Sequence, residues 1–287
     1  MKARDHKGRW FALALLVLGT CLAGPAVAAG ADALCLACHD AGNWPGVHAL
    51  LDGPHGVASD PRSPAGGAGC ATCHEAGEHP RNPTVAPTPV EGACIACHRA
   101  DALHWETSVH AAEDVQCSTC HDVHATRATV AREDQAGGCY GCHRDVRMEA
   151  NLPSRHPIRE GLTTCSDCHA PHGSLERASL RGVNPNESCL DCHEAQRGPF
   201  LFDHPAASDD CGNCHVPHGS VHEPLLARRP PQLCQQCHLA NFHPSDLVAG
   251  GGLPGARPDA NLLGRNCLSC HPRVHGSNHP SGARLTR

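Results

Sequence analysis

The sequence predicts a fold of short α-helices and long loops with almost no β-sheet. Its 287 residues include 29 Gly and 24 Pro, which recur between the more regular stretches. Phe, Trp and Tyr together number only eight, so few large side chains are present to build a hydrophobic core. Cys and His number 21 and 25, far above ordinary globular usage. Such a chain must be organised around something other than its own side chains.

Residues 1–28 are predicted to be a signal peptide. A basic start, MKARDHKGRW, precedes the apolar run FALALLVLGTCLAG and the small-residue segment AVAAGADA, with cleavage expected after Ala28. An uncleaved membrane anchor is the alternative, but the apolar run is short and no other segment is long and apolar. Thr20 disfavours a lipid anchor on Cys21. We therefore expect an exported mature chain, residues 29–287, that forms one domain.

Cleavage leaves 20 cysteines, and all of them lie in ten CxxCH motifs. Exported cysteine pairs normally suggest disulfides, and CxxC with His also suits zinc. Here every pair is followed by His, and no cysteine is left over for bridges. CxxCH binds haem c: the two cysteines form thioethers with the haem vinyl groups, and the histidine is the proximal iron ligand. The sequence therefore predicts ten haem c groups and a multihaem cytochrome c fold, with helices and loops wrapped around a linear haem chain.

The predicted haem-attaching cysteines are Cys35, Cys38, Cys70, Cys73, Cys94, Cys97, Cys117, Cys120, Cys139, Cys142, Cys165, Cys168, Cys189, Cys192, Cys211, Cys214, Cys234, Cys237, Cys267 and Cys270. The predicted proximal ligands are His39, His74, His98, His121, His143, His169, His193, His215, His238 and His271.

Histidine is also the predicted distal ligand. Fourteen histidines of the mature chain lie outside the motifs, whereas the only methionines are Met1 and Met148, and no lysine follows residue 28. Two histidines per iron, without methionine to raise the potential, predict low-potential haems.

A two-haem unit recurs about every 47 residues, with the pattern His–CxxCH–xxHis–CxxCH. This repeat selects ten candidate distal ligands: His55, His79, His110, His124, His156, His172, His204, His218, His243 and His275. Four further histidines are the reserve, with His48 a rival to His55 at the first haem: His48, His104, His222 and His279.

The stretch CSDCHAPHG places His172 three residues after His169, on the same side of a short turn. The two axial ligands of one iron approach from opposite faces, so His172 cannot complete its own haem. We expect it to bind a neighbouring haem and to tie two haems together.

Three stretches resemble the decahaem cytochromes of the MtrA/DmsE type: RHPIREGLTTCSDCHAPHGS from Arg155, LCQQCHLANFHPS from Leu233 and CLSCHPRVHGSNHPSG from Cys267. The resemblance runs from Cys35 to the C-terminus. It implies an elongated periplasmic haem chain associated with the outer membrane and often inserted into a β-barrel porin. Such a protein passes electrons between periplasmic donor or acceptor cytochromes and the cell exterior. The motif spacings show no five-haem duplication, so two separable halves are not expected.

Residues 29–287 contain 19 Arg and 28 acidic residues, a net charge of −9, so no basic excess favours nucleic acid or anionic lipid. Arg144, Arg147, Arg228 and Arg229 either pair with haem propionates or are solvated. The segments 79–90 and 249–259 are expected to be exposed loops, and Trp105 to pack on a porphyrin.

The predicted function is electron transfer rather than catalysis. A multihaem reductase for nitrite or hydroxylamine needs an open iron, often at a CxxCK haem, and this chain has no CxxCK motif. With fourteen histidines for ten sites, no iron needs to stay open. A soluble periplasmic shuttle and a polymeric extracellular filament share the same haem chemistry and stay open as alternatives.

Overall fold

The computed structural model describes residues 33, 35–67, 69–74, 91–125, 130–238, 266–280 and 282–286. The chain divides into two compact units. The first comprises residues 1–99 and 117–129 and carries the motifs that begin at Cys35, Cys70, Cys94 and Cys117. The second comprises residues 100–116 and 130–287 and carries the other motifs, from Cys139 onward.

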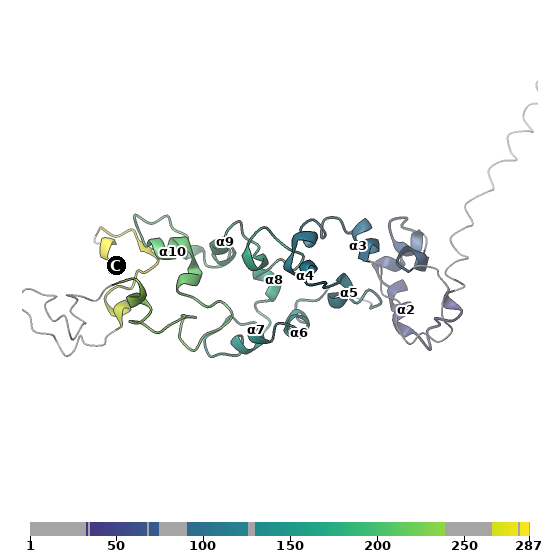
Figure 1. The fold of residues 1–287 in the computed structure, drawn as a ribbon, viewed down its shortest axis with the longest axis horizontal. Coiled ribbons are helices and arrows are strands. Elements are labelled where there is room, and N and C mark those ends of the chain that lie inside the picture. Colours follow the sequence, from purple (N-terminus) through teal and green to yellow (C-terminus); the bar gives the residue numbers. More distant parts are fainter. Residues whose placement is uncertain are drawn as a thin grey trace, which may run out of the picture. The chain divides into compact units, whose positions relative to one another are not determined.

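The helices are short and are joined by loops, as Figure 1 shows for both units. Among the described residues, the α-helices of the first unit are α2 (Pro45–Leu51), α3 (Glu91–Cys97) and α5 (Cys117–Cys120). Those of the second unit are α4 (Val109–Ala112), α6 (Gln135–Tyr140), α7 (Arg144–Glu149), α8 (Cys165–Cys168), α9 (Pro185–Leu190) and α10 (Pro205–Asp209). Single 3₁₀ turns add η1 (Pro54–Gly56), η2 (Pro64–Gly66), η3 (Gly69–Thr72), η4 (Trp105–Thr107), η5 (Arg177–Ser179), η6 (Glu194–Gln196), η7 (Cys211–Asn213), η8 (Cys234–Gln236), η9 (Cys267–Ser269) and η10 (Gly282–Arg284).

Each CxxCH motif folds into one helical turn. In all ten, the backbone N–H of the motif histidine donates to the carbonyl oxygen of the first cysteine, with N···O distances of 2.8–3.0 Å. This i to i−4 bond places both cysteines and the histidine near one side of the turn. The turn thus holds the three groups that a haem c requires in one local arrangement.

Strand structure is limited to a few residues in the described part of the chain. Strand β1 (Phe202–Asp203) pairs antiparallel with β2 (Gly276–Ser277), in the register Phe202 with Ser277. An isolated antiparallel bridge joins Ser154 to Ser220. The predicted fold class, short helices and loops with almost no sheet, is therefore confirmed.

The described residues bury very little apolar side chain. Ala150 and Leu226 are the buried hydrophobic residues among them, whereas Leu175 and Val183 are 93% and 90% exposed. Burial of apolar surface normally supplies most of the stabilising free energy of a domain. The described residues supply little of this contribution, as the shortage of aromatic residues predicted.

Buried polar side chains connect the segments instead. The Asn186 amide in α9 donates to the carbonyl oxygen of Ser208 at 2.9 Å, and its oxygen accepts from the backbone N–H of Cys211 at 2.8 Å. Asn186 is only 7% exposed. Hydrogen bonds of a buried amide are costly to lose, so Asn186 fixes the motif of Cys189 against that of Cys211.

Candidate haem sites

Motif histidines of the first unit lie opposite histidines from distant parts of the sequence. The ring of His98 lies 6.1 Å from that of His55, measured between centroids. The ring of His74 lies 6.0 Å from that of His124, and the two are stacked at 28°. Each pair joins one motif histidine to one histidine outside the motifs.

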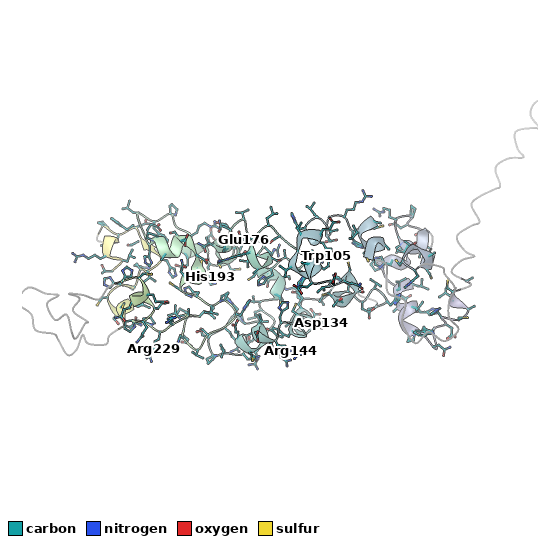
Figure 2. All side chains as sticks on the ribbon, viewed as in Figure 1. Trp105, Asp134, Arg144, Glu176, His193 and Arg229 are labelled. Atoms are coloured by element: carbon teal, nitrogen blue, oxygen red, sulfur yellow. The ribbon has the colours of Figure 1, made fainter. Side chains whose placement is uncertain are left out.

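The second unit repeats this arrangement along its length. Its ring pairs have centroid distances of 6.1–6.2 Å and are His143 with His110, His193 with His156, His169 with His218, His238 with His204, and His215 with His275. His193 is marked in Figure 2 on the segment that follows α9.

These separations fit an iron between the two rings. A bond from a transition metal to imidazole nitrogen is about 2.0 Å, and the ring centre lies about 1.1 Å behind that nitrogen, so two opposed ligands have centroids about 6.2 Å apart. Direct ring packing needs no such constant spacing. The pairs therefore fit a haem with two axial histidines.

The pairs follow a fixed rule along the sequence. We number the motifs in chain order, so that the motif of Cys35 is the first. A histidine that precedes an even-numbered motif pairs with the histidine of the motif after it: His156, before the sixth motif at Cys165, pairs with His193 of the seventh. A histidine three or four residues after the last residue of an even-numbered motif pairs with the motif two places back, as His218 pairs with His169 and His275 with His215. The ring of His218 therefore faces neither its own motif histidine nor the adjacent motif.

Backbone carbonyl groups orient many of these rings through the second nitrogen. The Nδ1–H groups of His110, His156 and His204 donate to Pro171, Pro217 and Val274, at 3.0, 2.8 and 2.7 Å. Three motif histidines do the same over shorter sequence distances: His169 to Ala178, His215 to Pro224 and His271 to Arg284. A carbonyl oxygen only accepts, so the proton is fixed on Nδ1 and the Nε2 lone pair is left for a metal.

Burial favours the neutral imidazole that a metal requires. The pKa values of His55, His74 and His275 are lowered, in each case first by burial and then by the paired histidine. A neutral ring is the ligating form.

A glycine directly follows three of the predicted distal histidines that lie shortly after a CxxCH motif, and it permits another segment of the chain to approach closely. A Cβ on Gly173 would lie 3.0 Å from the carbonyl carbon of His104, and Gly173 has φ +102°. A Cβ on Gly219 would lie 2.7 Å from the carbonyl carbon of Glu149. A Cβ on Gly276 would likewise overlap the Phe200 side chain. Sequence reasoning missed these glycines, although the repeated His–Gly dipeptide after CxxCH was the signal.

Cysteines of successive motifs also meet. Cys139 and Cys165 are hydrogen-bonded, and this bond is the main cause that lowers the pKa of the Cys165 thiol to about 7. The pKa of the Cys189 thiol is raised to about 12, first by burial and second by the neighbouring Cys211. The pKa of the Cys234 thiol is raised to about 11, first by burial and second by the neighbouring Cys267. Cysteines predicted to attach neighbouring haems are therefore adjacent.

Of the reserve histidines, His48 is engaged elsewhere. Its Nε2 donates to the carbonyl oxygen of His39 at 3.1 Å, while His55 faces His98 of the third motif.

Other predicted residues have contacts that do not test their predicted roles. The Nδ1 atom of His172 lies 3.7 Å from an oxygen of Asp101. The Trp105 ring lies 6.4 Å from that of His110. Two of the predicted distal ligands, His79 and His243, and both predicted loops, 79–90 and 249–259, fall outside the described residues.

CxxCH turns beside opposed histidines, among described residues that bury almost no apolar side chain, define a multihaem c-type cytochrome. The family described as the doubled CXXCH motif matches residues 110–148, 156–198 and 204–241. Over 274 residues, 90% of this chain and 81% of the relative, the sequence is 38% identical to the multiheme cytochrome MtrA of Shewanella baltica. The chain belongs to the family of MtrA-type multihaem c-type cytochromes, and its cofactor is haem c.

Proposed function

We propose that this protein transfers electrons through ten covalently bound haem c groups, each with two axial histidines. The observation that carries this proposal is the constant 6.0–6.2 Å spacing between motif histidines and histidines outside the motifs. Ten CxxCH motifs supply the attachment points. The bound haem supplies the one-electron chemistry, and this chain attaches, orients and spaces the groups.

The proposed distal ligands within ring pairs are His55, His110, His124, His156, His204, His218 and His275. His79, His172 and His243 are proposed from the sequence repeat alone. Two histidines per iron leave no coordination position for a substrate. This supports an electron carrier over a nitrite or hydroxylamine reductase.

Adjacent cysteines support rapid transfer between haems. Because Cys139 contacts Cys165, the thioether edges of their two haems would lie next to each other. The same holds for Cys189 with Cys211 and for Cys234 with Cys267. Electrons would then pass from one haem edge to the next without a diffusing carrier.

We further propose that the mature domain, residues 29–287, works in the periplasm and connects it to the outer membrane and the cell exterior within a β-barrel porin. The predicted signal peptide supports export. In the described part of the chain, no helix is long and apolar enough to cross a membrane. The porin and the donor or acceptor cytochromes would be separate proteins.

Fractionation of native cells tests this location. We expect haem-stained protein to co-purify in detergent with an outer-membrane β-barrel and to resist protease added to intact cells. Recovery wholly in the soluble periplasmic fraction would contradict the porin proposal and favour a shuttle. On the purified protein, intact mass gives the number of attached haems. A purely low-spin ferric spectrum is expected, and a substantial high-spin component would favour a reductase.

A further inference from the structure

One distal-position imidazole has a carboxylate partner within hydrogen-bonding distance. The Nδ1 atom of His218 lies 3.2 Å from Oε2 of Glu149, and the ring of His218 is stacked at 30° on the opposed ring of His169. The His218 and Glu149 side chains are 32% and 41% exposed. The contact is therefore partly shielded from water.

The equivalent nitrogens of His110, His156 and His204 donate to neutral backbone carbonyls. Asp101 approaches His172 only to 3.7 Å, beyond direct hydrogen-bonding length. Glu149 therefore gives the His169–His218 pair an environment that differs from those three.

The backbone holds Glu149 in this place. Glu149 is the last residue of α7, and its carbonyl group packs on Gly219, directly after His218. Ser154 and Ser220 exchange two backbone hydrogen bonds, with N···O distances of 3.0 and 2.8 Å, which join the same two segments. The carboxylate and the imidazole thus face one another across a fixed junction.

We propose that Glu149 is a positioning residue that lowers the reduction potential of the haem attached at Cys165 and Cys168. This inference rests on the proposed ligation of that haem by His169 and His218. A carboxylate that accepts from Nδ1 makes the imidazole a stronger donor, and its negative charge favours the ferric over the ferrous state. The electron on this haem is then held less tightly than it would be with a neutral partner.

The test is Glu149→Gln in the purified holoprotein, because glutamine keeps the size and an acceptor oxygen but removes the charge. At an applied potential equal to the wild-type midpoint of this haem, we expect the ratio of reduced to oxidised haem to be about tenfold higher in the variant. This corresponds to a rise of about 59 mV in the reduction potential for one electron. Potentiometric titration would show one haem moving to higher potential, and ferric EPR would show one low-spin component altered. Asp145→Asn removes a charge from the same helix, and we expect a smaller change from it.

A third variant separates the two levels of the proposal. His218→Ala is expected to convert one low-spin ferric haem to high spin. Without that conversion, the ligand assignment itself is wrong, and the role of Glu149 falls with it. If His218→Ala converts one haem but Glu149→Gln titrates like Asp145→Asn, the ligation stands and the inference about Glu149 is overturned.

Discussion

Replacement of Gly219 by alanine tests whether close backbone approach holds the distal-position histidines. An added Cβ would lie 2.7 Å from the carbonyl carbon of Glu149, whereas ordinary contact begins at 3.4 Å, and it would lie closer still to the carbonyl oxygen. We estimate that the two segments must separate by about 1 Å to restore carbon–carbon contact. The Ser154–Ser220 hydrogen bonds, now 3.0 and 2.8 Å, would then exceed bonding length.

The loss of these two bonds is expected to cost about 1–3 kcal/mol locally. Because His218 precedes Gly219, its ring would be displaced from that of His169. Ferric EPR of the holoprotein should therefore show a high-spin component that the wild type lacks, and this component should grow with temperature or denaturant. The matched control is Gly137→Ala in α6, where nothing lies within 4 Å of the added methyl. The reasoning is refuted if Gly219→Ala is as low-spin and as stable as Gly137→Ala.

Three further experiments test other parts of the structure. His55→Ala should convert one haem to high spin, because His55 faces His98. His48→Ala should leave the spectrum unchanged, because His48 donates to the carbonyl oxygen of His39. The reverse result would exchange the roles of the two histidines. The Arg132 guanidinium, with help from the Thr164 N–H, holds the pKa of the Asp167 carboxyl at about 2. The stabilising effect of this ion pair is therefore present above the ordinary carboxyl pKa and is lost only as the pH falls through about 2. Arg132→Ala should lower stability slightly at neutral pH and have progressively less effect as the pH falls toward and below 2, as denaturant titrations at several pH values would reveal. Chain produced without haem attachment should have little fixed structure by circular dichroism, because its described residues bury so little apolar surface; a native-like spectrum would contradict this.

The fold class was predictable because local chemistry determines it. Ten CxxCH turns form through bonds within five residues, and the scarcity of large apolar side chains excludes a conventional core. The two-haem repeat also selected the seven histidines outside the motifs whose rings face motif histidines in the described residues. Resemblance to the MtrA type then agreed with the 38% identity.

The partner of each histidine was not predictable, because it depends on contacts between segments far apart in sequence. The repeat grouped His110, His124 and His143 in one unit, but His110 faces His143 while His124 faces His74 of the preceding unit. What decides this is the approach of backbone to backbone, as at Gly219 and Glu149. The His–Gly dipeptide marks such an approach in the sequence but does not identify the segment that approaches. His48 and His55 likewise differ in their tertiary contacts, since His48 bonds to the carbonyl oxygen of His39 and His55 faces His98.

The backward pairing of histidines has a consequence for how the protein matures. An exported chain emerges N-terminus first, yet the ring that faces His169 belongs to His218, 49 residues later, and the ring that faces His215 belongs to His275, 60 residues later. On the proposed ligation, a haem attached at Cys165 or Cys211 as soon as that motif emerges would keep one open face until two more motifs have crossed the membrane. Assembly of these haems would then be vectorial, because His218 and His275 each complete a haem attached earlier, and a pause in translocation would expose an incompletely ligated iron to the periplasm.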